Sequence, residues 1–230
     1  MSTVTIMSTV EQDVAPLERG DKLSRDEFLR RWEAMPHVKR AELIGGIVYM
    51  PSPLSWKHGV TDIRVGTWLT VYAASTPGCE TGSNATWLML EDSPQPDSYL
   101  RILPEYGGQS GMQGLYAQGA PELTAEVCLS STSYDLHQKL NLYQEAGVKE
   151  YVAVLLRERE VRWHRLVDGA YQLLPSDADG VIRSVVFPGL WLHARALLDG
   201  NMAQVLATLT QGLNTPDHTA FVAQLAQRRS

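Results

Sequence analysis

The sequence predicts an α/β domain with a mixed central β-sheet flanked by helices and preceded by an N-terminal β-hairpin. Apolar residues at helical spacing follow clear helix-start signals, and β-rich runs gather in the middle of the chain. The predicted order is helix, hairpin, helix, several strands, helix and further strands. This alternation is typical of an α/β architecture.

The first elements follow a stretch over 1–20 that has no periodicity and is expected to be a flexible leader. The sequence Ser24-Arg25-Asp26-Glu27 has the form of a capping box, and apolar residues follow at helical spacing until Pro36. In AELIGGIVYM, residues 41–50, two β-rich segments flank Gly45-Gly46. Two glycines between such segments indicate a tight two-residue hairpin.

The remaining elements make up the predicted sheet and its helices. A helix is expected over about 56–77, followed by strands over 85–90, 97–103 and 123–129, with a polar, glycine-rich loop before the last strand. A helix over 133–146 precedes strands over 151–156, 161–167, 170–174 and 181–186. Amphipathic stretches near 202–213 and 219–228 predict a C-terminal helical extension over 201–230, outside a main domain over 21–200.

Composition narrows the possible classes of protein. No apolar run is long enough to span a membrane, and the N-terminus lacks the apolar stretch of a secretory signal. Cys79 and Cys128 match no zinc or redox spacing, so a reduced, cytoplasmic location is expected. The net charge of −6 argues against a broad nucleic-acid-binding surface but is compatible with a local basic groove.

Three charged residues form the candidate chemical site. Asp97 begins one predicted strand, Glu126 lies within another, and Lys139 is on the helix after it. Two carboxylates on adjacent strands suit Mg²⁺, which needs only one or two protein carboxylates, and an ammonium nearby can stabilise developing negative charge. Taken alone, the spacing also fits Asp97 as a turn residue and Lys139 as a solvated helix lysine. Glu126 fits such a reading poorly, because burying an unpaired carboxylate is costly.

Longer motifs resemble a known family. The stretch QGAPELTAEVCLSSTSYDLHQKLNLYQEAGVKEYVAV resembles the signature of the Uma-type family of restriction endonucleases, within the PD-(D/E)XK nuclease superfamily. The hairpin AELIGGIVYMPSP followed by His58-Gly59, the segment PQPD, and FPGLWLHARALL resemble further blocks of that family. The resemblance extends over roughly residues 22–200.

The resemblance implies a restriction-endonuclease-like core that hydrolyses phosphodiester bonds of DNA with Mg²⁺, for which Mn²⁺ can substitute, and with no nucleotide cofactor. It implies Asp97 and Glu126 as metal ligands and Glu42 as a third carboxylate that ligates the metal or a water on it. Lys139 stands in for the lysine that the superfamily motif places at the position of Cys128. A homodimer and no membrane partner are also expected.

Several assignments keep an alternative. His58 is either an auxiliary base or phosphate contact, or simply a partly exposed residue at a helix start. Tryptophans could stack on bases, although core packing is favoured, and the arginines over 157–165 could contact phosphate, although a solvated hairpin is favoured. Ser130-Ser131-Thr132 and Gly45-Gly46 depart from the family's usual Ser-Pro-Ser and Asp-Gly.

The function also keeps two alternatives: a non-catalytic binding or assembly module with the same fold, and a hydrolase of another phosphoester. An enzyme would be favoured if four side chains lie close together at an open cleft: Glu42, Asp97, Glu126 and Lys139. The non-catalytic module would be favoured if Lys139 points to solvent.

Overall fold

The computed structural model describes residues 14–50, 55–129 and 134–229, and its centre is a six-stranded sheet in the order β11-β10-β9-β8-β5-β3. Strands β8 and β9 pair in parallel, and the other neighbours in this sheet pair antiparallel. The mixed sheet confirms the predicted fold class. Its strands are β3 (Cys79–Gly82), β5 (Ser98–Ile102), β8 (Leu123–Cys128), β9 (Glu150–Leu155), β10 (Glu160–Val167) and β11 (Ala170–Leu173).

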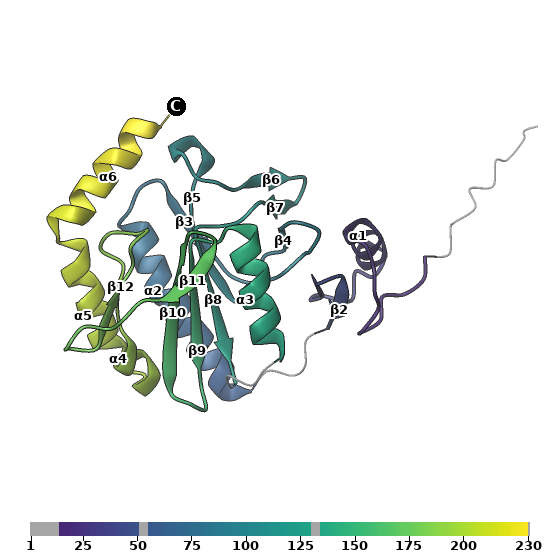
Figure 1. Cartoon of the computed structure of the whole chain (residues 1–230), viewed down its shortest axis with the longest axis horizontal. Helices are drawn as coiled ribbons and strands as arrows, with labels where there is room; N and C mark the ends of the chain where they lie inside the picture. The colour runs from purple at the N-terminus through teal and green to yellow at the C-terminus, as the bar shows by residue number, and fades with distance from the viewer. Residues whose placement is uncertain (1–13, 51–54, 130–133, 230) are drawn as a thin grey trace, which may run out of the picture.

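Helices cover both faces of this sheet. Because side chains alternate along a strand, Ala125 and Val127 of β8 enter one apolar cluster while Cys128 packs against another. The first cluster includes residues of α2, α4, α5 and α6, and the second includes residues of α3. Figure 1 shows α4–α6 at the left of the sheet and α3 at its right. The bounds are α2 (Trp56–Ala74), α3 (Tyr134–Ala146), α4 (Ala194–Asp199), α5 (Met202–Leu213) and α6 (Pro216–Arg228).

The N-terminal part of the chain forms a small unit with its own core. Helix α1 (Arg25–Glu33) packs with the hairpin β1 (Glu42–Ile44) and β2 (Ile47–Tyr49). Gly45 and Gly46 both have positive φ, and their N–H groups donate to the carboxylate of Asp92 at 2.8 and 3.1 Å. Leu17, within the expected leader, is buried in this unit, whereas residues 1–13 lie outside the described residues.

The structure differs from the predicted elements in the segment before and after Asp97. Instead of a strand over 85–90, β4 (Trp87–Leu88) pairs with β7 (Tyr116–Gln118), which also pairs with β6 (Gly111–Gln113). The glycine-rich loop therefore contains two short strands as well as η1 (Pro104–Tyr106). Leu90 has a positive φ of 51°, and the chain reverses there so that Met89 bridges to Asp92.

The C-terminal part of the sheet region also differs. The expected strand over 181–186 is shorter, because β12 (Val181–Arg183) pairs only with β13 (Trp191–His193). Ser184, Val185 and Val186 instead turn to donate hydrogen bonds to the buried carboxylate of Glu150. Within the described residues, no helix is both long and apolar enough to cross a membrane.

Candidate functional site

Two neighbouring strands bring the first two carboxylates together. Ser98 of β5 pairs with Ala125 of β8, so the next residues outward, Asp97 and Glu126, flank that pair. The Val127 N–H donates to Oδ2 of Asp97 at 2.9 Å, which fixes this carboxylate against the neighbouring strand. Glu126 is 5% exposed and points to the face covered by α3, the face opposite Val127.

Lys139 joins two carboxylates that are far apart in the sequence. Its Nζ lies 2.9 Å from Oε1 of Glu126 and 2.9 Å from Oε1 of Glu42, and the residue is only 8% exposed. The ammonium reaches these partners because α3 follows β8 directly and packs back over the sheet. Lys139 is therefore a buried ion-pair partner, and its interpretation as a solvated helix lysine is wrong.

Glu42 links the N-terminal hairpin to this cluster. Besides the contact with Lys139, its Oε1 accepts a hydrogen bond from the Gln95 N–H at 2.6 Å. Gln95 belongs to the PQPD segment that leads into β5. The hairpin is thus held against the residues that position Asp97.

Tyr143 is a member of the site that the sequence analysis missed. Its hydroxyl donates to Oε1 of Glu126 at 2.7 Å, the same oxygen that accepts from Lys139. Lys139 and Tyr143 are four residues apart on α3, a spacing that places two side chains on one helix face. This spacing could have indicated Tyr143 once Lys139 was assigned.

Helix α2 supplies His58 and Asp62 from the other side. Nε2 of His58 lies 3.3 Å from Oδ2 of Asp97, and the histidine side chain is 14% exposed. His58 is thus a partly exposed residue near the start of α2 that also contacts the cluster. Asp62 is four residues later, and burial together with the charge of Asp97 raises the pKa of its carboxyl. The sequence motifs do not indicate Asp62, although the same four-residue spacing connects it to His58.

Burial and mutual charge shift the acidity of the cluster. Burial, with the negative charges of Asp97 and Glu42, raises the pKa of Glu126 to about 8, against the opposing effect of Lys139. Burial would lower the pKa of Lys139, but the carboxylates around it raise that pKa instead and hold the ammonium. Asp97 shows the opposite balance: burial would raise its pKa, but the hydrogen bond to His58 and the charge of Lys139 lower it.

The balance between carboxylates and ammonium in this cluster also determines whether a metal cation could bind there. Glu42, Asp97 and Glu126 carry three potential negative charges against one from Lys139. Burial raises the pKa of Glu126, and the charges of Asp97 and Glu42 raise it further. A divalent cation would offset this excess, and oxygen-only donors suit Mg²⁺. No set of three histidine, cysteine or acidic side chains within 14–50, 55–129 and 134–229 is already gathered as a metal site. The oxygen donors available to such a cation are the carboxylates of Asp97, Glu126 and Glu42.

Comparison with models of known protein families assigns the chain to a family. The model of the family described as "Uma2: Putative restriction endonuclease" matches residues 25–195, a range that contains all the site residues above. The chain belongs to the Uma2 family. Helices α5 and α6 of this Uma2 protein lie beyond the matched range. The division into a leader, a main domain and a C-terminal extension stays a prediction.

A solved structure supports the fold of this Uma2 protein. The crystal structure of a "putative nuclease belonging to DUF820" from Anabaena variabilis ATCC 29413 matches with a TM-score of 0.61 at 15% identity. The match covers 77% of this chain and 98% of that one. Among curated proteins, none matches. At this identity the likeness concerns the fold, and the roles of individual side chains rest on the geometry described above.

Proposed function

We propose that this Uma2 protein is an endonuclease that hydrolyses phosphodiester bonds of DNA with the help of Mg²⁺ or Mn²⁺. The observation that carries the proposal is the buried Lys139 ammonium, shared between Glu126 and Glu42 beside Asp97. Removing several charges from water costs free energy, and buried clusters of charged groups with shifted pKa values are concentrated at functional sites. Membership in the Uma2 family supports nuclease activity.

The two strand carboxylates are the proposed metal ligands. Asp97 is held by its backbone hydrogen bond and by His58, and Glu126 keeps its Oε2 free of the contacts made by Lys139 and Tyr143. Glu42, whose Oε1 contacts Lys139, would add a third oxygen from the hairpin. A bound divalent cation would polarise the phosphate and acidify water in this site.

Lys139 and His58 are the proposed cationic and proton-handling groups. An ammonium has three donors, and two of those on Lys139 face Glu126 and Glu42. The third can orient the attacking water or a phosphate oxygen and stabilise the charge that develops on phosphorus. His58, whose pKa is raised by its hydrogen bond to Asp97, is the auxiliary group that can contact phosphate or carry a proton.

The test compares DNA with a simple phosphodiester. Purified protein is incubated with supercoiled plasmid and with bis(p-nitrophenyl) phosphate in Mg²⁺, Mn²⁺ or EDTA, together with Asp97→Asn, Glu126→Gln and Lys139→Met. Lys39→Met, at an exposed lysine outside the site, is the matched control. Metal-dependent plasmid cleavage that persists in Lys39→Met and disappears in the three site variants is expected.

Other outcomes distinguish the alternatives. Cleavage of the small diester without cleavage of DNA would overturn the DNA assignment and indicate another phosphoester. Absence of hydrolysis and of Mn²⁺ binding by folded protein would overturn the enzymatic proposal in favour of a non-catalytic module.

A further inference from the structure

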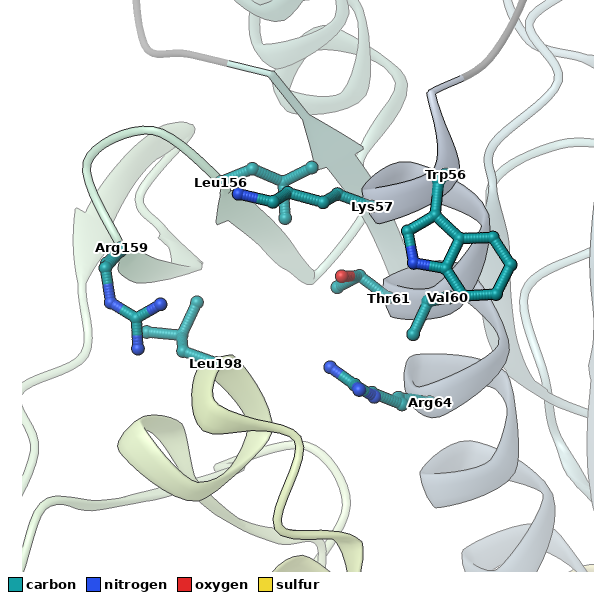
Figure 2. Close-up of a pocket in the computed structure, with 8 residues that line it drawn as sticks. All are labelled: Trp56, Lys57, Val60, Thr61, Arg64, Leu156, Arg159 and Leu198. Carbon is teal, nitrogen blue, oxygen red and sulfur yellow. The ribbon is translucent and has the colours of Figure 1, made fainter.

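A cavity of about 190 Å³ lies beside the site, between the start of α2, the β9–β10 turn and the end of α4. Figure 2 shows Lys57 and Arg64 reaching from α2 toward this space and Arg159 facing them from the turn. The cavity is lined by Trp56, Lys57, Val60, Thr61, Arg64, Leu156, Arg159 and Leu198.

The charged groups in this cavity are all cations. Arg159 is paired with Asp199, whereas neither Lys57 nor Arg64 has an ion-pair partner in the part of the chain that the structure describes. The Arg64 guanidinium lies against Gly200, where a Cβ would lie 2.5 Å from Nη2. Such a local group of cations, in a chain of net charge −6, is suited to attract an anion.

Trp56 lines one side of the cavity with an aromatic ring, and it is not packed in the core. It is 83% exposed, whereas Trp68, Trp87 and Trp163 are fully buried, as core packing predicts for them. An exposed indole beside cations is the arrangement by which proteins bind single-stranded nucleic acid, because any base can stack on its face. For Trp56, the base-stacking alternative is therefore favoured over core packing.

The cavity is adjacent to the candidate active site on the same helix. His58 contacts Asp97, and the charge of Asp97 acts on Asp62. Lys57 comes one residue before His58 and Thr61 one residue before Asp62, and both line the cavity. Successive residues of an α-helix differ by about 100° around its axis. The cavity and the active site therefore border the same stretch of α2, on adjacent sides of the helix.

We infer that this cavity is a subsite for an unpaired nucleotide that flanks the scissile phosphate, with its phosphate at Lys57, Arg64 and Arg159 and its base on Trp56. The inference rests on the proposed nuclease function and narrows its substrate to DNA with a single-stranded segment at the cleavage site. A base within a duplex is stacked on its neighbours and offers no face to the indole. A cavity of about 190 Å³ is also far too small for a duplex.

The experiment measures binding without hydrolysis. Fluorescence anisotropy in EDTA compares a labelled single-stranded oligonucleotide with the same sequence as a blunt duplex, and the intrinsic tryptophan emission is followed in parallel. We expect tighter binding of the single strand, with quenching of Trp56. Trp56→Ala should weaken that binding roughly 5- to 100-fold, while Trp56→Phe, which keeps a stacking face, should retain most of it.

The cations are tested in the same way. Lys57→Ala and Arg64→Ala should each weaken binding and reduce the slope of log K against log salt by about 0.7 to 1. Lys39→Ala, an exposed lysine outside the cavity, should change neither. Unchanged single-strand affinity in Trp56→Ala and Lys57→Ala, or a preference for the duplex that these variants leave intact, would overturn the subsite.

The two proposals can fail separately. If the parent protein cleaves DNA while the cavity variants bind and cleave as it does, the subsite is wrong and the nuclease stands. If the parent binds single strands through Trp56 and Lys57 yet cleaves nothing in Mg²⁺ or Mn²⁺, the subsite stands and the proposed catalytic function is wrong.

Discussion

The ammonium of Lys139 lies 2.9 Å from the carboxylate of Glu126, although the two residues belong to different elements 13 positions apart. The distance is short because α3 follows β8 and packs on the face of the sheet to which Glu126 points. Both groups are almost fully buried, so removing either one takes a charged partner from the other in a medium of low polarity: Lys139 would keep only Glu42, and Glu126 only the hydroxyl of Tyr143.

Lys139→Met should abolish catalysis and destabilise the fold. Losing one partner of a buried pair costs roughly 3–5 kcal/mol, and losing a preorganised cation costs about 10²–10³ in kcat. In Lys139→Met/Glu126→Gln the buried charge of Glu126 is removed together with the ammonium, although Glu42 still lacks its ion-pair partner. The free energy of unfolding should therefore recover in part while activity stays lost. Urea unfolding and plasmid cleavage measure the two effects, and strictly additive losses in the double variant would contradict the pairing.

Tyr143→Phe should weaken catalysis through Glu126. The variant removes only the hydroxyl that donates to Oε1 of Glu126, so we expect roughly tenfold slower cleavage and a loss of about 1–3 kcal/mol in unfolding free energy. Tyr171→Phe is the matched control, because its hydroxyl donates to the Val148 carbonyl at 2.9 Å, away from the site. Equal activity losses in the two variants would show that Tyr143 acts only on stability.

Added Mn²⁺ should stabilise the protein through Asp97 and Glu126. A ligand that binds only the folded state contributes about 2.7 kcal/mol at a free concentration about 100 times its Kd, so Tm should rise with metal and fall again on addition of EDTA. Asp97→Asn and Glu126→Gln should lose most of this rise, and Asp179→Asn, at an exposed loop position, should keep it. A rise that is identical in all four proteins would place the metal elsewhere.

His218 should make the protein more sensitive to acid. Burial lowers the pKa of this histidine, against the opposing hydrogen bond to the Leu213 carbonyl, so the unfolded chain takes up a proton at a higher pH than the folded one. The free energy of unfolding therefore falls as pH drops below about 6.5, the ordinary histidine pKa, toward the lower folded value.

The test compares urea unfolding at about pH 7.5 and about pH 5.5. His218→Asn should lose less stability between these two conditions than the parent, even though it forfeits the contact with Thr76 and starts less stable. His37→Asn, at an exposed position, should follow the parent. An unchanged pH slope in His218→Asn would contradict the assignment.

Much of the fold could be predicted because its signals are local. The capping box at Ser24, the Gly45-Gly46 turn and the apolar spacing of α2 and α3 each act within a few residues, and the structure has these elements where they were expected. Strands β4 and β13 were missed or misplaced because they are only two or three residues long, and β4 is also defined by a partner distant in the chain, β7.

For the site, the sequence determined the residue types and, through the family motifs, which of them to consider: Glu42, His58, Asp97, Glu126 and Lys139. Only the tertiary structure decided that Lys139 is buried between two carboxylates, that Tyr143 and Asp62 join them, and that Trp56 is exposed beside three cations. The reason is physical. Periodicity reveals the face of a helix or strand on which a residue lies, but the burial, charge partners and pKa of that residue depend on which other face packs against it.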